Sequence, residues 1–474
     1  APVPLAGFLT TIGGQSRCGS YPPIGLHGTI GTYTLTFTMH ATAIANTQSI
    51  TLDHGVAYQL AMSSPATLVN DTAFSTQPVV TIQDQDNNTV TTGSDSTQLV
   101  TLSSTDATIG GTYSMNAVAG VANFSGNGVK LTGLVGTRNL TATISSPSTL
   151  FKANSVSLTV GAADHLAFGT QAAGAVNGTV FTTQPVVNIV DISGNQTTST
   201  ATVSIASSGP ALGGTYSKAA VAGTATFTDV KLTGTAGSLT LTYSATGVTD
   251  LVQSITLVAS DASQLLVTVS STLVNDTVFS IQPVVTIKDA SGNVVTSGAQ
   301  STQLVTLSST DATIGGTVSM NAVNGVADFT GLGIKLTGLV GARNLTATIS
   351  SPSTITGTAS VTITYGAATQ LAITTQADGA ASRKVFTTQP VIKIQDVSGN
   401  TVDNATNTIT FTSSTTGRVG TTTKAAVNGV ATFSGIGIFG TAGTATLTFG
   451  TSGFSNVTQS IQLTHGDAYK LLTL

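Results

Sequence analysis

The chain has few charged residues and no tryptophan. Asp, Glu, Lys and Arg make up 7% of its 474 residues, against about 25% in an average globular protein. Helices that face solvent need Glu, Lys and Arg, so the scarcity of these residues argues against a helical fold. The formal net charge of −4 is small for this length. It therefore gives no reason to expect nucleic acid or an anionic membrane as a partner.

Cysteine and long apolar runs are also scarce. Cys18 is the only cysteine, so no disulfide can form within the chain, and the sequence leaves open whether its thiol is free or cross-linked. No run of about 18 apolar residues occurs, so we expect no insertion into a membrane. The surface is instead rich in hydroxyl and methyl groups, which give little electrostatic protection against self-association. Such a surface is useful in a lattice or a fibre.

Residues that usually carry chemistry are isolated. No pair of histidines has the spacing of metal ligands; the five are His27, His40, His54, His165 and His465. Glycine-rich stretches lie between predicted strands rather than before a helix, so they do not read as phosphate loops. Each turn offers one or two Asp carboxylates, whereas Ca²⁺ needs about 6 to 8 oxygens, so turn capping is the better interpretation. We predict no catalytic, cofactor-binding or metal site, and no enzyme activity.

A repeat with a period of 205 residues dominates the sequence. The triplet Gln-Pro-Val occurs four times at spacings of 107, 98 and 107, beginning at Gln77, Gln184, Gln282 and Gln389. Residues 96–112 are identical to residues 301–317, which again lie 205 positions further on. A long and a short unit therefore alternate along the chain.

Within each unit, short strand patterns alternate with turn signals. Residues 181–189 contain the apolar residues of a core strand, and their Pro falls at the strand entry, where a missing N–H is tolerated. The sequence Asp-x-Ser-Gly-Asn follows, for example at 191–195, and combines an Asp that can bond its own turn with a Gly that supplies positive φ. About seven short strands per unit, without helical periodicity, predict a β-sandwich.

The segment Val-x-Ile-x-Asp-x-x-Gly-Asn, as at 187–195 and 285–293, resembles the bacterial immunoglobulin-like repeats of invasin-type adhesins and other secreted surface proteins. The resemblance implies an all-β chain of tandem immunoglobulin-like β-sandwich domains that form an elongated rod. The chain lacks the acidic clusters that calcium-stiffened adhesin stalks carry at their junctions, so we do not expect stiffening by Ca²⁺. The junction at 160–166 has almost no linker, and we expect a semi-rigid rod.

The repeat divides the chain into six segments. We predict an incomplete domain at 1–54, a long-type domain at 55–161, a short-type domain at 162–259, a long-type domain at 260–365, a short-type domain at 366–466 and a single strand at 467–474.

The two terminal segments look complementary. Residues 28–37 parallel 440–449, and 48–52 parallel 459–463, so 1–54 reads as the back half of a domain whose opening strands are missing. Residues 465–471 match 54–60, which form the first strand of a domain. A sandwich that lacks a strand can accept one from another chain.

The main hypothesis from these ends is a structural subunit of an extracellular filament, polymerised head-to-tail with identical subunits. The predicted donor residues are Ala468, Tyr469, Leu471, Leu472 and Leu474, and the predicted acceptor residues are Leu35, Phe37, Ile50 and Leu52. The alternatives are a stalk fragment of a larger cell-surface adhesin and a surface-layer protein. Glycans on surface Asn, Ser or Thr are left open as further partners, since ten Asn-x-Ser/Thr sequences occur, including those at Asn70, Asn139, Asn177, Asn275 and Asn344.

Overall fold

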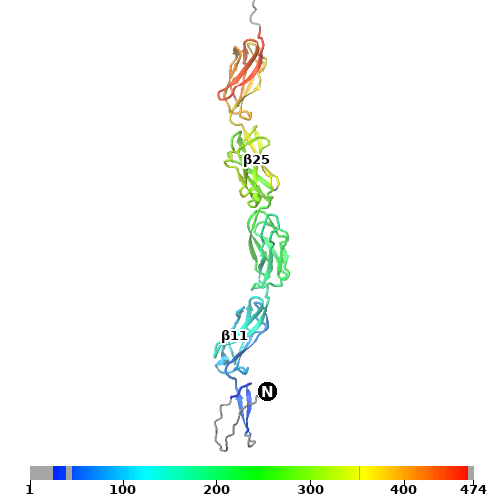
Figure 1. The fold of residues 1–474 in the computed structure, drawn as a ribbon, viewed down its shortest axis with the longest axis vertical. Coiled ribbons are helices and arrows are strands. Elements are labelled where there is room, and N and C mark those ends of the chain that lie inside the picture. The colour runs from blue at the N-terminus through cyan, green and yellow to red at the C-terminus, as the bar shows by residue number, and fades with distance from the viewer. Residues whose placement is uncertain (1–24, 39–44, 352, 468–474) are drawn as a thin grey trace, which may run out of the picture.

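The computed structural model describes residues 25–38, 45–351 and 353–467. Over these residues it consists of short β-strands, with two single-turn 3₁₀ helices, η1 (Ser94–Thr97) and η2 (Ala299–Thr302). The units follow one another in a long row (Figure 1). The predicted fold class, an all-β rod of tandem immunoglobulin-like sandwiches, is confirmed. In the described part of the chain, no helix is long and apolar enough to cross a membrane.

Four separate hydrophobic cores lie along the chain, and we name the units domains 1 to 4 after them. Their buried residues span 57–158, 166–257, 262–363 and 371–463. Domains 1 and 3 have the long-type sequence, and domains 2 and 4 have the short-type sequence. A two-stranded hairpin, β1 (Gly31–Thr38) with β2 (Ala45–Leu52), precedes domain 1.

The long domains share one strand plan. In domain 1 the strands are β3 (Gln59–Ser63), β4 (Thr67–Val69), β5 (Val79–Gln83), β6 (Leu99–Ser103), β7 (Thr108–Gly110), β8 (Ser114–Asn116), β9 (Val121–Asn123), β10 (Lys130–Thr132), β11 (Gly136–Ile144) and β12 (Leu150–Thr159). In domain 3 they are β22 (Gln264–Thr268), β23 (Thr272–Val274), β24 (Val284–Lys288), β25 (Leu304–Ser308), β26 (Thr313–Gly315), β27 (Ser319–Asn321), β28 (Val326–Asp328), β29 (Lys335–Thr337), β30 (Gly341–Ile349) and β31 (Ile355–Thr364).

The short domains share a second plan. In domain 2 the strands are β13 (His165–Thr170), β14 (Val186–Val190), β15 (Thr202–Ser207), β16 (Ala211–Gly213), β17 (Ser217–Ala219), β18 (Thr224–Thr226), β19 (Lys231–Thr233), β20 (Gly237–Ser244) and β21 (Leu251–Leu257). In domain 4 they are β32 (Gln370–Thr375), β33 (Lys384–Val385), β34 (Val391–Gln395), β35 (Thr408–Ser413), β36 (Gly417–Val419), β37 (Thr423–Ala425), β38 (Val430–Thr432), β39 (Gly437–Phe439), β40 (Gly443–Gly450) and β41 (Val457–Leu463).

Each domain packs a three-stranded sheet against a larger one. In domain 2 the orders are β13-β14-β18 and β17-β15-β20-β21, and in domain 1 they are β3-β5-β9 and β4-β12-β11-β6-β8. Buried and outward-facing residues alternate along strands such as β5 and β21, as expected of a sheet with one face in the core. In the long domains a short strand, β4 or β23, adds in parallel to the last strand.

The repeated Gln-Pro-Val triplet has a structural role inside each sandwich. The Gln77 side chain donates to the carbonyls of Phe74 and Val129 and accepts the Val129 N–H at 2.8 Å. The same bonds recur at Gln184, Gln282 and Gln389. The triplet therefore ties the entry of a core strand to a neighbouring strand, because backbone groups at such edges need partners.

Candidate functional site

The junctions between domains are the most elaborate polar sites in the described chain. Each is centred on one predicted turn. In domain 2, Asp191 Oδ1 accepts the N–H groups of Ser193 and Asn195 at 3.0 Å each. The Gly194 N–H closes the turn on the Asp191 carbonyl, and Gly194 has φ 83°. The prediction that this Asp caps its own turn is therefore confirmed.

The second oxygen of the same carboxylate reaches the preceding domain. Asp191 Oδ2 accepts a 2.8 Å hydrogen bond from the side-chain amide of Asn70, which lies in domain 1. It also accepts the N–H of Gly161 in the linker at 2.9 Å. The Asn70 amide donates to Ser193 Oγ as well. One carboxylate thus joins the turn, the linker and the neighbouring domain.

A second side chain of the turn fixes the orientation of the two domains. The Asn195 amide donates to the carbonyl of Gly133 at 3.0 Å, and its oxygen accepts the N–H of Val135 at 2.9 Å. Asn70 accepts the Gly133 N–H at 2.9 Å, so it is itself anchored in domain 1. Bonds to Asn70, Gly133 and Val135 come from separate points on domain 1 and restrict rotation between the domains.

We call this set of bonds the junction clamp, and it recurs at the next two junctions. The bonds across them join Asn177 to Asp289 and Asn275 to Asp396 at 2.8 Å each, and Asn293 and Asn400 to the backbone of the preceding domain. A related contact seats the β1–β2 hairpin on domain 1: Asn88 accepts the Ile30 N–H and donates to the Gly28 carbonyl.

The clamp residues are buried, so their electrostatics differ from those of surface Asp. Asp191, Asp289 and Asp396 have no exposed surface. Burial raises the pKa of the Asp191 carboxyl, but the hydrogen bonds from Gly161, Asn195 and Asn70 outweigh it and lower this pKa to about 2. Burial and the bonds from Asn293 and Asn177 likewise leave the pKa of Asp289 at about 2. The carboxylates are therefore ionised at neutral pH and balanced by amide donors.

The distal end of domain 4 departs from this pattern. Ser382 occupies the position of Asn70, since its N–H donates to the Thr464 carbonyl as that of Asn70 donates to Thr159. Its hydroxyl accepts the Gly440 N–H at 3.5 Å. The next residue, Arg383, has φ 64° like its counterpart Asp71, and its guanidinium lies 5.0 Å from the centre of the Phe439 ring. This end therefore lacks the Asn donor of the junction clamp.

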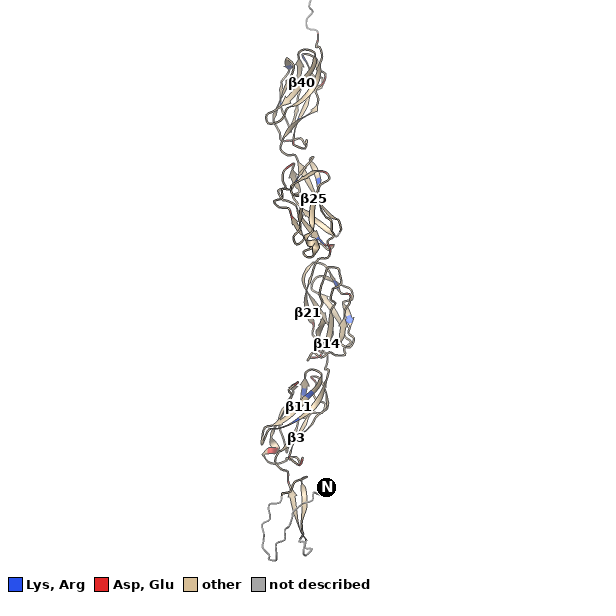
Figure 2. Ribbon diagram, in the orientation of Figure 1, with Lys and Arg blue, Asp and Glu red and all other residues tan. Residues whose placement is uncertain are grey.

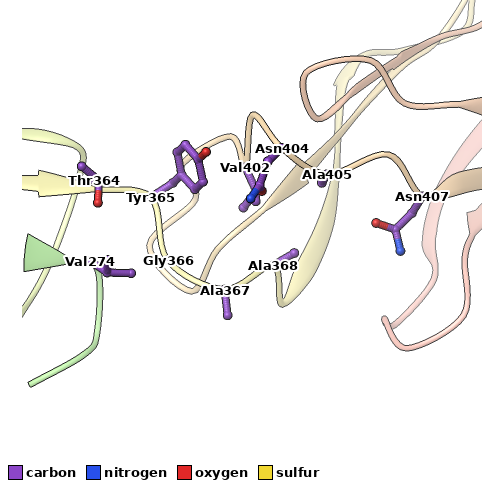
Figure 3. Close-up of a pocket in the computed structure, with 10 residues that line it drawn as sticks. All are labelled: Val274, Thr364, Tyr365, Gly366, Ala367, Ala368, Val402, Asn404, Ala405 and Asn407. Atoms are coloured by element: carbon purple, nitrogen blue, oxygen red, sulfur yellow. The ribbon is translucent and has the colours of Figure 1, made fainter.

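A shallow groove runs beside the junction of domains 3 and 4 (Figure 3). It has a volume of about 660 Å³ and is lined by aliphatic side chains, the Tyr365 ring and the amides of Asn404 and Asn407. Tyr365 packs against the core of domain 4. The lining contains no carboxylate, imidazole or amine, so it offers no acid–base chemistry beyond one phenol.

Charged groups are sparse elsewhere on the described surface (Figure 2). Lys130 contacts Asp71 at 2.7 Å in domain 1, Lys335 contacts Asp276 at 2.7 Å in domain 3, and Lys384 pairs with Asp467 beyond the last strand of domain 4. In the described ranges, no group of three or more His, Cys, Asp or Glu side chains could hold a metal ion.

The four predicted acceptor residues lie on one face of the β1–β2 hairpin. Tyr33 pairs with Ile50, and Gly31 with Leu52, so Tyr33, Leu35 and Phe37 share a face with Ile50 and Leu52. Phe37 is 51% exposed and Ile50 is 38% exposed, whereas Leu35 and Leu52 are half-buried. The structure therefore brings the acceptor residues together. The predicted donor residues Ala468, Tyr469, Leu471, Leu472 and Leu474 lie outside the described residues.

The same face is closed in the short domains. Their hairpins, β20–β21 and β40–β41, have the register of β1–β2. Phe37 corresponds to Tyr243 and Phe449, and both of these side chains are 0% exposed. Gln48 corresponds to Gln253 and Gln459, which are buried. The hairpin is thus the counterpart of a short-type domain with its inner face uncovered among the described residues.

The chain matches no protein-family model and no curated protein sequence. Among solved structures it is similar to invasin, a bacterial integrin-binding protein, with 15% identity over 86% of this chain and 79% of that one and a TM-score of 0.28. The FdeC adhesin of Escherichia coli has 19% identity over 65% of this chain and 99% of that one, with a TM-score of 0.33. Domains 4–9 of the surface layer protein SbsC have 17% identity over 86% and 66%, with a TM-score of 0.19.

At these identities the likeness to the three bacterial proteins is one of fold. The resemblance predicted from the turn sequence is confirmed.

The role of the junction Asn residues was not predicted. From the sequence, Asn70, Asn177 and Asn275 are candidates only for glycan attachment, yet all three are buried and bonded across a junction. A glycan at these positions would break the clamp. Asn139 and Asn344 are exposed and stay compatible with modification. The missed signal was spacing, because Asn70, Asn177 and Asn275 recur at the 107 and 98 intervals of the repeat.

Proposed function

We propose that the chain is a stalk, a semi-rigid spacer within an extracellular surface protein that holds other parts of that protein away from the cell. The observation that carries the proposal is the junction clamp, which recurs at the three junctions between domains 1 to 4 with an Asn–Asp bond of 2.8 Å at each. If the domains swing apart, the buried carboxylate loses the hydrogen-bond donors that the preceding domain and the linker supply. Bending therefore costs free energy. A chain of independent domains would not need these bonds.

The repeat itself also supports a spacer. Each domain adds one core and one clamp, so length grows in equal steps without a new fold. The outer surface has little charge, and the groove at the junction of domains 3 and 4 offers little chemistry, which suits a part that separates rather than binds. Location outside the cell is part of the proposal.

The stalk proposal is tested by the shape of single molecules. The double variant Asn70→Ala/Asn275→Ala removes the Asn donor at the first and third junctions. Electron microscopy and small-angle X-ray scattering of the 474-residue chain are expected to give straight rods, and the variant a wider spread of junction angles. Asn139→Ala/Asn344→Ala, at exposed positions in the same two domains, serves as the matched control. Wild-type rods that bend as freely as the variant contradict the proposal.

A filament subunit is the second candidate function, favoured by the uncovered apolar face of the β1–β2 hairpin. Strand donation from the C-terminal residues of another copy would cover this face and propagate head-to-tail. One observation weighs against that donor. The hairpin is of the short type, with Phe37 and Gln48, whereas long domains carry Ala142 and Asn154 at these positions. Residues 465–471 instead match the long-type opening at 54–60.

Deletion of residues 467–474 distinguishes the two candidates. A filament polymerised through this segment forms long fibres that disappear in the deletion variant. A stalk gives single rods in both cases. Fibres that persist after the deletion contradict strand donation by this segment, and flat two-dimensional arrays favour a surface-layer protein.

A further inference from the structure

The groove beside the junction of domains 3 and 4 has two walls (Figure 3). One wall is the linker at 364–368, and the other is the loop of domain 4 at 402–407, just before β35. A volume of about 660 Å³ and a position between two domains are typical of sites that bind small ligands. The repeat shows which of the lining residues the junction itself requires, because the junction of domains 1 and 2 is built on the same plan.

The linker wall departs from the repeat at one residue. Residues 364–368 are identical to residues 159–163 except that Tyr365 stands in place of Val160. The Gly after each of these residues donates its N–H to the clamp Asp at 2.9 Å, so the two linkers are anchored in the same way. The clamp therefore does not require a ring at this position, and Tyr365 adds an aromatic surface to the wall.

The loop wall also departs from the repeat. Seven residues separate the clamp Asn from the next strand in domain 4, against six in domain 2. The carbonyls of Asn407 and Ala201 accept equivalent backbone hydrogen bonds, so Asn407 stands where domain 2 has Ala. The extra residue lies before it, in the part of the loop that contains Asn404.

The two loops are held in different ways. In domain 2 the Thr197 hydroxyl donates to the Ile189 carbonyl at 2.8 Å. The Ser199 hydroxyl accepts a backbone N–H of the same loop at 3.2 Å. The equivalent residues of domain 4, Val402 and Ala405, are apolar and buried in its core. The domain 4 loop is therefore held without its Asn side chains.

The polar groups of the groove are two side-chain amides and one phenol, from Asn404, Asn407 and Tyr365. Within the described part of the chain, no hydrogen bond engages these three side chains. Each amide offers both donors and an acceptor. The Tyr ring offers an apolar face with a polar edge. No charged side chain lines the groove.

We propose that this groove binds a neutral saccharide. One face of a sugar ring carries C–H groups, which pack against the electron-rich face of an aromatic ring. The hydroxyls at its rim both donate and accept, as the amides do. A sulfated or carboxylated sugar would lose solvation here without gaining a counter-ion, whereas a neutral sugar would not.

This inference goes beyond the stalk proposal and does not rest on it. The clamps set the shape of the rod, and the groove adds one point of contact at a single junction. The lack of acid–base groups in the lining fits a spacer, but it does not prevent binding, because a neutral ligand needs no charged partner.

The test is binding of neutral oligosaccharides to the 474-residue chain. The probes are di- to tetrasaccharides of glucose, galactose, mannose and N-acetylglucosamine, screened by saturation-transfer NMR and titrated by calorimetry. We expect saturable binding of at least one probe. Absence of binding by every probe overturns the proposal, and so does tighter binding of a sulfated form of the same sugar. Tighter binding of a proline-rich peptide to the groove assigns it to a peptide and also overturns the proposal.

Three substitutions locate the bound sugar. Tyr365→Val restores the residue of the first linker and should weaken binding by about tenfold or more, because the stacking surface is lost. Asn404→Ala and Asn407→Ala should each weaken binding by about threefold to tenfold, as expected for the loss of a hydrogen bond. Binding that is unchanged in both Tyr365→Val and Asn404→Ala overturns the proposal.

The matched controls are Tyr216→Val and Asn139→Ala, at exposed positions in other domains. Both should bind the probe as the wild type does. Calorimetric unfolding of each variant separates loss of the groove from loss of the fold. Asn404→Ala keeps the test decisive if Tyr365→Val destabilises domain 4, because Asn404 is exposed.

Discussion

The side-chain amide of Asn70 donates a 2.8 Å hydrogen bond to the carboxylate of Asp191, although 121 residues separate them along the chain. The other oxygen of Asp191 shapes the turn of its own domain. One buried side chain therefore sets both the local turn and the position of that turn on the neighbouring domain. Misfolding of the turn and bending of the junction are coupled, because each removes donors from the same carboxylate.

Asp191→Asn tests this coupling. The substitution keeps the shape but replaces one acceptor oxygen with an NH₂ group, which then faces N–H donors from the turn, from Gly161 or from Asn70. We expect domain 2 to lose about 2–4 kcal/mol of stability, since buried donors are left without an acceptor. Differential scanning calorimetry of the full chain measures it, together with junction angles by electron microscopy.

The control for that variant is Asp250→Asn, because Asp250 is exposed in the same domain. We expect it to change stability by less than about 0.5 kcal/mol. Equal melting temperatures for Asp191→Asn and Asp250→Asn contradict the coupling of turn and junction.

Acid is expected to weaken the junctions only at low pH. Asp191 and Asp289 have pKa values of about 2 in the folded chain, lowered from the ordinary 3.8. A lowered pKa contributes stability that is present above pH 3.8 and is lost as the pH falls toward 2. Each group contributes about 2 kcal/mol, from 1.36 kcal/mol per pKa unit. The free energy of unfolding of domains 2 and 3 should be constant from pH 5 to 8 and should decrease between pH 4 and 2. Weakening that begins above pH 5 would show that other groups control the junctions.

Glycine in the linker is required by the close approach of two backbones. A Cβ on Gly366 would lie 2.6 Å from the backbone oxygen of Asn275. Gly366→Ala should therefore push domains 3 and 4 apart and weaken the bond from residue 366 to Asp396. We expect a kink at this junction and a loss of about 1–3 kcal/mol, measured by scattering and calorimetry. Gly209→Ala is the control, because no heavy atom lies within 4 Å of the added Cβ. It should leave the junction angle and the stability unchanged. Equal changes in the two variants would contradict a steric role for Gly366.

The fold was predictable because its signals are local. The turn at 191–195 contains its own Asp, Gly and Asn within five residues, and the strands on either side alternate in polarity. Turn geometry and burial on one face follow from such short patterns. The 205-residue period then extended one domain pair to the whole chain.

The junction clamp was not predictable in the same way. Asn70 and Asp191 belong to different domains, and an Asn followed by Asp-Thr reads equally well as a surface turn. Only the relative placement of two folded domains brings the pair together. The acceptor face was predictable because the hairpin at 31–52 repeats the sequence of two complete domains, which identified its apolar residues.

Gln253→Leu tests the pair of hydrogen bonds that joins the Gln253 side chain to the Ala172 backbone inside domain 2. The substitution removes both bonds to the backbone of Ala172 and the bond that Gln253 accepts from the Tyr243 hydroxyl at 3.1 Å. Three buried polar groups are then unpaired, so we expect domain 2 to lose about 2–4 kcal/mol. Gln171→Leu, at an exposed neighbouring position, should have no comparable effect. If both variants unfold at the wild-type temperature, the stability of domain 2 does not depend on the bonds between Gln253 and Ala172.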